Sequence, residues 1–386
     1  MTESPEAAQI LRRAAWALRA QFFVAGALFA TWGVHVPSIK DHYGLGEQAL
    51  AIAMLASGAG SVFALLQAGR VLAHRSPRKI APALVLACVA AIGNLLTTSS
   101  YAVLLALMLA YGVAAALFDV AINDEATALE LATGRHLMSG FHGMFSLGGL
   151  AGAGTWSLLA IAGVLPVAHL AGASVALGVL SLAASRCMLR QERHGHAEGG
   201  HLSLPRGSLA LLGLMAAIGL VGEGAMYDWS VLYMRQELAA PAASASLAYA
   251  SFSLAMAAGR FAGDAVRARM APVPLLRWSG LLGAIGMTLA LVAGQPWAAL
   301  AGFALVGLGF ANMVPVLFSA AGRTPGVTPA HAIAAVSSVG YFGMMVGPPL
   351  IGFIAQARSL KAGLVVVIVF SLVVGLLARR ALRAAA

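Results

Sequence analysis

Twelve long apolar segments, joined by short polar connections, constrain this sequence more than any other feature. A helix that crosses the hydrocarbon core of a bilayer needs roughly 20 mostly apolar residues. Because lipid offers no hydrogen-bond partners, a spanning segment must satisfy its own backbone groups, as a helix does. The sequence therefore predicts an all-α membrane protein with twelve transmembrane helices, near residues 17–38, 47–71, 79–98, 101–129, 137–163, 166–189, 207–236, 244–266, 274–294, 297–321, 329–356 and 361–380.

The composition agrees with a membrane protein. Hydrophobic residues make up 60% of the chain and charged residues 10%, whereas about a quarter of the residues in soluble domains are charged. Residues 1–16 have no apolar core followed by a small-residue cleavage site, so we expect no removable signal peptide. Cys88 and Cys187 lie in separate apolar segments and are interpreted as small buried hydrophobic residues. We expect no disulfide, metal site or cofactor.

The basic residues indicate how the chain is oriented in the membrane. The formal net charge is +10, and of the 24 Lys and Arg only four fall in the connections of one side, namely Lys40, Arg235, Arg358 and Lys361. Basic residues collect on the cytoplasmic side of membrane proteins. This distribution predicts a multi-pass protein of the cytoplasmic (inner) membrane with both termini in the cytoplasm. Since topology accounts for the positive charge, we expect no nucleic-acid partner.

The sequence divides into two similar halves. A polar stretch at 189–207 follows the sixth apolar segment, and its His-rich part at 194–201 is interpreted as linker rather than as a metal site. "AGRVLAHRSPRKIAP" at 68–82 and "AGRFAGDAVRARMAP" at 258–272 occupy matching places in the two halves. Parallel repeats of this kind place a cavity at the interface between the halves. We predict two pseudo-symmetric six-helix bundles, with a cytoplasmic segment at 1–16, bundles at 17–189 and 207–386, and a linker at 190–206.

These features are similar to those of the major facilitator superfamily, and the resemblance covers essentially the whole chain. "RVLAHRSPRK" at 70–79 resembles the loop pattern G-x-L-A-D-R-x-G-R-R, with His74 in place of the acid. The second half keeps an acid at Asp264. In that family the loop latches the two halves in one state of the transport cycle, which implies a gating role for His74, Arg75, Arg78 and Asp264. An anchor that only fixes topology is the alternative.

Within the superfamily, the fourth and fifth segments resemble the fucose–proton symporter branch. "DVAIN" at 119–123 matches its acid-x-x-x-Asn pattern, and 135–149 is similar to its fifth helix. The resemblance implies that Asp119 is the proton-coupling acid, Asn123 a polar partner, and His142 a contact for substrate or proton. That branch also carries an acid in its first helix, where this chain has Gly33. Fucose itself is therefore not the expected substrate.

The positions of the acids in the fourth segment support a functional Asp119. A carboxylate deep in a membrane is costly unless paired, hydrated or protonated, and is functional by default. Antiparallel fourth and fifth helices would bring Asp119 to nearly the depth of His142. A fixed hydrogen-bonded pair that clamps the two helices is the alternative. Asp124, Glu125 and Glu130 are expected at a solvated helix end, with Glu125 as the candidate exception.

A second polar cluster lies in the seventh segment. Glu223 is near its middle, and Tyr227 follows at the spacing that puts two side chains on one helix face. Asp228 is the next candidate, and these residues are typical of a sugar-type site. Alternatively, Trp229 and Tyr233 belong to the aromatic belt at the membrane surface while Asp228 pairs with Arg235. Further substrate-binding candidates are Trp32, His35 and Asn312, although His35 could be interfacial and Asn312 could bond another helix.

Taken together, the sequence predicts a secondary transporter rather than an enzyme. It has no phosphate-binding loop or nucleophile motif, so an ion gradient is the expected energy source. We predict proton-coupled uptake of a small polar, sugar-like solute by a monomer, with proton coupling at Asp119, His142 and Glu223. The fifth helix lacks the Gly-Pro element of the family's drug–proton antiporters, which favours uptake. An efflux antiporter for an amphipathic compound and a non-transporting membrane sensor are the alternatives.

Overall fold

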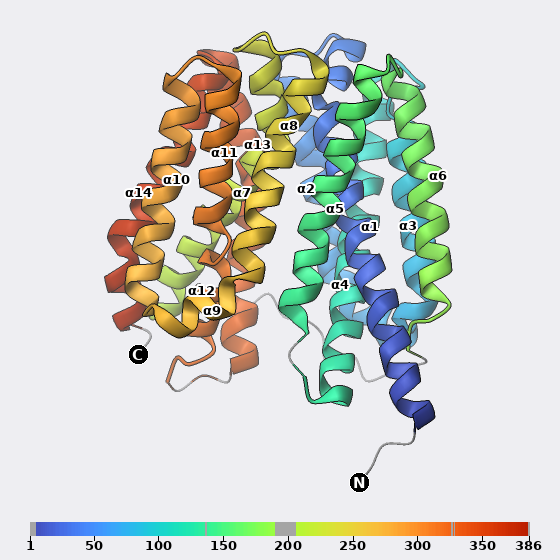
Figure 1. Cartoon of the computed structure of the whole chain (residues 1–386), viewed down its shortest axis with the longest axis vertical. Helices are drawn as coiled ribbons and strands as arrows, with labels where there is room; N and C mark the ends of the chain where they lie inside the picture. Colours follow the sequence, from blue (N-terminus) through green and yellow to red (C-terminus); the bar gives the residue numbers. More distant parts are fainter. Residues whose placement is uncertain (1–4, 136, 190–205, 326, 328, 385–386) are drawn as a thin grey trace. The chain divides into compact units, whose positions relative to one another are not determined.

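The computed structural model describes residues 5–135, 137–189, 206–325, 327 and 329–384, and all regular elements in these ranges are helices (Figure 1). The first half of the chain forms six helices: α1 (Pro5–Tyr43), α2 (Glu47–His74), α3 (Pro77–Gly93), α4 (Tyr101–Thr133), α5 (Met138–Ile161) and α6 (Pro166–Ser185). The second half forms α7 (Ser208–Gln236), α8 (Ala242–Phe261), α9 (Gly263–Arg269), α10 (Pro272–Val292), α11 (Pro296–Phe310), α12 (Met313–Ala321), α13 (Pro329–Ala357) and α14 (Leu360–Ala384).

This arrangement confirms the predicted all-α architecture of twelve apolar spans. In the described part of the chain, eleven helical segments are long and apolar enough to cross a membrane, and the remaining span, α3, is shorter at 17 residues. Proline occupies the first turn of α3, α6, α10 and α11. Because the first helical N–H has no intrahelical acceptor, proline starts a helix there without losing a hydrogen bond.

Two features of the fold were not predicted. The tenth apolar segment is broken into α11 and α12 at Ala311 and Asn312, and a short helix, α9, follows α8. The expectation for the cysteines was half wrong, because Cys88 is buried but Cys187 is exposed. Cys187 lies two residues after the end of α6, in the turn that follows the helix.

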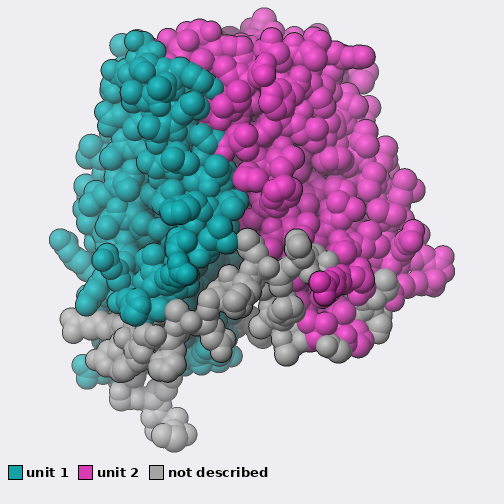
Figure 2. Space-filling model, turned by 180° about the vertical axis from the view of Figure 1, so that it is seen from behind, with its two compact units in different colours: residues 1–35, 56–200 teal, residues 36–55, 201–386 magenta. Residues whose placement is uncertain are grey.

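The chain divides into two compact units (Figure 2). One comprises residues 1–35 and 56–200, and the other residues 36–55 and 201–386. Residues 36–55, which are the end of α1, the start of α2 and their connection, therefore group with the second half of the chain. The domain boundaries drawn from the sequence placed this segment in the first bundle, and that division stays a prediction.

Glycines let helices pack closely within each unit. A Cβ on Gly148 of α5 would overlap the carbonyl oxygen of Phe23 in α1, and one on Gly112 of α4 would overlap that of Ser57 in α2. In the second unit, Gly286 of α10 and Gly302 of α11 face each other in the same way. In lipid, helices gain no hydrophobic free energy by associating, so close van der Waals packing holds them together. Small residues at the contacts allow this close approach.

Two glycines of α5 give a matched test of this packing. We expect Gly148→Ala to destabilise the protein by about 1–3 kcal/mol, the usual cost of overpacking. A Cβ added to Gly154 would meet no atom within 4 Å, so Gly154→Ala should be neutral or stabilise by up to about 1 kcal/mol through helix propensity. Thermal unfolding of the purified variants would check both, and equal effects would contradict the assigned packing.

Candidate functional site

Asp119 and Asn123 form a polar pair on α4 in the first unit. Both side chains are half-buried. The Asn123 Nδ2 donates to the Asp119 carbonyl oxygen at 2.8 Å and to the Asp119 Oδ1 at 3.2 Å. Residues four apart lie on one helix face, so the acid-x-x-x-Asn spacing itself brings the pair together. Asp119 is thus a carboxylate in an apolar span with a neutral amide as hydrogen-bond donor.

His142 lies on α5 and is half-buried. Its ring meets the Phe22 ring of α1 edge-on, with 5.3 Å between the ring centroids. Its carbonyl oxygen accepts a hydrogen bond from the Ser146 Oγ. The predicted pairing of His142 with Asp119 stays a prediction.

The acids at the end of α4 hold backbone groups of other segments. Glu125 is buried, and its Oε1 accepts a hydrogen bond from the Leu189 N–H after α6. The Glu130 Oε1 accepts from the N–H groups of Leu137 and Met138 at the start of α5. A carboxylate is favourable where the first N–H groups of a helix lack partners. Glu130 therefore holds the start of α5, where the sequence suggested a solvated helix end. Glu125, the candidate exception in the sequence, instead holds the backbone after the end of α6.

Glu223 is the centre of a buried ion pair in the second unit. Its Oε1 lies 3.0 Å from the Arg260 Nη2 of α8 and accepts a hydrogen bond from the Tyr227 hydroxyl at 3.3 Å. The carboxylate and guanidinium side chains are only 10% and 18% exposed. The predicted shared face of Glu223 and Tyr227 is confirmed. Arg260, however, was interpreted only as a charge that fixes topology. The available signal for it was an acid in the middle of an apolar span with no basic residue nearby on the same helix.

Aromatic rings enclose one side of this ion pair. The Tyr227 ring lies 5.0 Å from the Tyr249 ring and 5.1 Å from the Phe252 ring, both on α8. Asn312, at the break between α11 and α12, donates from Nδ2 to the carbonyl oxygen of Gly259 at 3.2 Å. Because Gly259 precedes Arg260, this hydrogen bond joins the helix break to the α8 turn that carries the guanidinium. Asn312 thus makes the interhelical bond that the sequence left as an alternative.

The other candidates on α7 lie in the core of the second unit. Trp229 and Tyr233 are buried, and the Tyr233 hydroxyl donates to the Ala290 carbonyl oxygen at 2.9 Å. Arg235 contacts the Ala240 carbonyl oxygen, and Asp228 is half-buried. The aromatic-belt alternative for Trp229 and Tyr233 was therefore wrong, because side chains facing other helices do not face the membrane surface.

A cluster of rings in the first unit contains His35. His35 and Trp32 are both buried, so the interfacial alternative for His35 was wrong. The His35 Nε2 lies 2.8 Å from the Nδ1 of His169 on α6, and the Trp156 ring of α5 is 4.3 Å from the His35 ring. The sequence analysis missed His169 and Trp156. A polar imidazole in the apolar α6 was the available signal.

The predicted gating residues lie at the ends of helices. His74 ends α2 and is exposed, as is Arg75, while Arg78 donates to the Met188 carbonyl oxygen at 3.0 Å. Asp264 lies in α9, but its side chain is outside the described part of the structure, as is the His-rich stretch 194–201. In the residues that the structure does describe, no group of three His, Cys, Asp or Glu could hold a metal ion.

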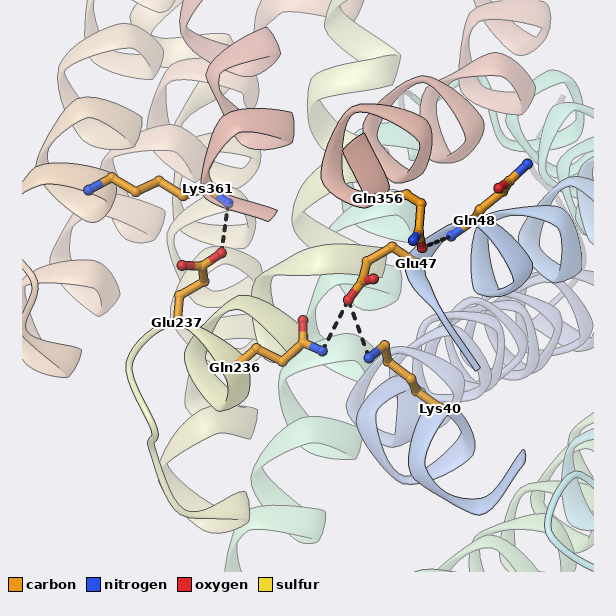
Figure 3. A network of polar contacts seen from close by, with 7 residues as sticks. All are labelled: Lys40, Glu47, Gln48, Gln236, Glu237, Gln356 and Lys361. Carbon is orange, nitrogen blue, oxygen red and sulfur yellow. Dashed lines mark hydrogen bonds and ion pairs between the residues drawn. The ribbon is translucent and has the colours of Figure 1, made fainter. Parts of the chain in front are cut away.

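A polar network joins the end of α1 and the start of α2 to α7 and α13 in the second unit (Figure 3). The Glu47 Oε1 lies 3.3 Å from both the Lys40 Nζ and the Gln236 Nε2. Nearby, the Gln356 Oε1 accepts from the Gln48 N–H at 3.4 Å. The same figure shows the Glu237 Oε1 accepting from the Lys361 N–H at the start of α14. We call the group of Lys40, Glu47, Gln48, Gln236 and Gln356 the outer network, because the orientation predicted from the sequence places this end of the helices outside the cytoplasm.

Comparison with known proteins agrees with this architecture. The profile of the Major Facilitator Superfamily matches residues 209–385. An uncharacterised MFS-type transporter of Yersinia pestis is 35% identical over 366 residues, which is 95% of each chain. The fold is similar to that of a D-xylose–proton symporter (TM-score 0.77, 13% identity, 95% of this chain and 96% of that one). It is also similar to the Escherichia coli fucose–proton symporter (TM-score 0.64, 16% identity, 95% and 98%). This chain therefore belongs to the major facilitator superfamily and is a multi-pass membrane transporter for a small molecule.

Proposed function

We propose that this protein is a proton-coupled uptake transporter for a small polar, sugar-like solute in the cytoplasmic membrane. The observation that carries the proposal is the contrast between two acids in apolar spans. Asp119 has the Asn123 amide as its donor, whereas Glu223 has the Arg260 guanidinium. The neutral amide leaves the negative charge of Asp119 uncompensated, so a proton bound there removes a costly charge from an apolar span, whereas a proton on Glu223 would leave the Arg260 guanidinium uncompensated. Removal of the uncompensated charge biases the two states of a transport cycle.

The group formed by Glu223, Tyr227 and Arg260 supports the binding of a polyhydroxylated solute. A carboxylate accepts hydrogen bonds from hydroxyl groups, a guanidinium donates them, and a tyrosine does both. The rings of Tyr227 and Tyr249 provide apolar faces close to these polar groups. We assign substrate binding to Glu223, Tyr227, Asp228, Arg260 and Asn312 in the second unit, and to Trp32, Asn123 and His142 in the first. The structural likeness to two sugar–proton symporters agrees with this class of substrate.

Purified protein in proteoliposomes tests this function. Radiolabelled sugars and polyols are offered with an imposed proton gradient, acidic outside, and we expect accumulation that collapses when an uncoupler dissipates the gradient. Greater retention after collapse would indicate an efflux antiporter instead. Binding without flux would indicate a sensor. Either result would overturn the proposal.

The outer network supports alternating access. It holds the end of α1 and the start of α2 against α7 and α13, and these contacts have to break when the outer side opens. We expect Glu47→Gln to favour opening, because it removes the ion pair with Lys40. An ion pair of this exposure contributes about 0.5–1 kcal/mol, which is roughly a two- to fivefold change in the population ratio.

Labelling by a membrane-impermeant maleimide measures this opening. The reporter is Ser38→Cys in a chain without Cys88 and Cys187, since Ser38 is half-buried close to the network. Asp41→Asn is the matched control, because Asp41 is an exposed acid in the same region. Labelling rates that respond equally to both substitutions would contradict a gating role for Glu47.

A further inference from the structure

Three aromatic side chains from three helices enclose each other in the first unit. They are His35 of α1, Trp156 of α5 and His169 of α6, and each is at most 5% exposed, with His35 fully buried. The ring centroids are 4.3 Å apart for His35 and Trp156, 5.0 Å for the two histidines, and 5.1 Å for Trp156 and His169. Two titratable rings from α1 and α6 are thus held together in the buried part of this unit.

The hydrogen bond between the two imidazoles fixes where their protons lie. The His35 Nε2 and the His169 Nδ1 are 2.8 Å apart, so one of them donates. The His35 Nδ1 is buried and has no hydrogen-bond partner. If His169 donated, the neutral His35 would carry its proton on Nδ1, as a buried N–H without an acceptor, which is rare in folded proteins. His35 therefore donates from Nε2, and its Nδ1 holds a bare lone pair.

A proton is the ligand that suits this lone pair. A fully buried ring offers no exposed surface to a solute, whereas a proton needs only the lone pair. Burial penalises the charged imidazolium, so contacts within the cluster have to offset that cost. Addition of one proton to Nδ1 forms one N–H bond and turns His35 into an imidazolium. Its Nε2–H bond to His169 then becomes charge-assisted and stronger. The electron-rich face of an indole within about 6 Å stabilises a cation, and the Trp156 ring is 4.3 Å away.

We propose that the His35–His169 pair, enclosed with Trp156, is a proton-binding site of the first unit. The groups that face His35 are the indole from α5 and the second imidazole from α6. Along α1 the nearest charged residue is Lys40, which pairs with Glu47. The site adds a second place, besides Asp119, where a proton changes the charge of this unit. Its use in coupling rests on the proposed function, but the binding of the proton does not.

Tryptophan fluorescence provides a direct test, because an imidazolium quenches a neighbouring indole more strongly than a neutral imidazole does. The purified full-length protein in nanodiscs is titrated from neutral to acidic pH. We expect a reversible loss of fluorescence in the wild type. The transition should be lost in His35→Gln, which removes the base, and in Trp156→Phe, which removes the reporter but keeps an aromatic ring.

His42→Gln is the matched control, since His42 is an exposed histidine on the same helix and its loss should leave the transition unchanged. Thermal unfolding identifies any variant that does not fold. If His35→Gln fails to fold, the fluorescence titration of Trp156→Phe tests the proposal instead. A transition that persists in a folded His35→Gln or Trp156→Phe protein, or that is absent from the wild type, overturns the proposal. Proton-driven uptake is measured separately, so failure of the proposed function and failure of this site give different results.

Discussion

Replacement of Asp119 by asparagine should abolish proton-driven accumulation while exchange of solute across the membrane continues. A 100 mV potential contributes about 2.3 kcal/mol per transported charge, which corresponds to roughly fifty-fold accumulation at 1.4 kcal/mol per tenfold. Asparagine has nearly the shape of aspartic acid but binds no proton. We therefore expect the accumulation ratio to fall from up to roughly fifty-fold to one, measured as labelled solute inside proteoliposomes with an imposed potential of about 100 mV and equal pH on both sides.

Counterflow distinguishes uncoupling from simple inactivation. Exchange of labelled for unlabelled solute needs no net proton movement, so an Asp119→Asn protein that exchanges but does not accumulate has lost coupling only. Asp124→Asn is the matched control, since it makes the same change further along α4, where Asp124 is also half-buried. Native accumulation by Asp119→Asn would refute the assignment of the coupling acid.

Replacement of Arg260 by glutamine should be the most destabilising single change in the second unit. It leaves the Glu223 carboxylate, which is 10% exposed, without its counter-charge. Breaking a buried ion pair by removal of one partner costs about 3–5 kcal/mol, because the other charge stays buried. We expect a loss near the lower figure, since the guanidinium is 18% exposed and solvent screens the pair in part. Thermal or denaturant unfolding of the purified protein would measure it.

A double-mutant cycle separates the interaction energy of Glu223 and Arg260 from the energy that each side chain contributes through its other contacts. Glu223→Gln combined with Arg260→Gln removes both charges and should recover much of the stability lost by Arg260→Gln alone. Arg277→Gln on α10 is the control, because Arg277 is exposed and its loss should change stability little. If the double variant folds but no longer binds solute, the pair serves recognition. If it folds and transports normally, the pair is structural and our substrate site is wrong.

Contacts within one helix could be predicted from the sequence. The four-residue spacing of Asp119 and Asn123, and of Glu223 and Tyr227, gives hydrogen bonds in the structure. Such pairs depend only on the helical repeat, which any sequence that forms a helix shares.

The broken tenth span also had a local signal, in Pro315. A proline inside a helix removes one backbone hydrogen bond and disrupts the turn before it, but it is tolerated in the first turn of a new helix. The structure accordingly ends α11 at Phe310 and begins α12 at Met313. The apolar run continues through the break, so hydropathy alone indicated one unbroken span.

Partners on different helices could not be predicted. The Arg260 guanidinium reaches Glu223 from α8, and His169 reaches His35 from α6. Each pairing requires the rotation and axial shift of two packed helices, and hydropathy reports only that each helix is apolar. The sequence analysis assigned Arg260 to the cytoplasmic charges from its position near the end of an apolar segment. That position does not show that the guanidinium points toward Glu223 on another helix.

The sequence by itself determined that this chain is a bundle of about twelve membrane-spanning helices in two related halves. The hydrocarbon thickness of a bilayer fixes the length and polarity of every span, and both can be counted along the chain. Only the tertiary structure decided which buried charges and imidazoles meet, and that residues 36–55 group with the second half of the chain. These pairings depend on how each helix is rotated against its neighbours, which is set by close contacts of small residues such as Gly148 against Phe23. Such contacts do not produce a regular pattern of apolar and polar residues that could be found in the sequence.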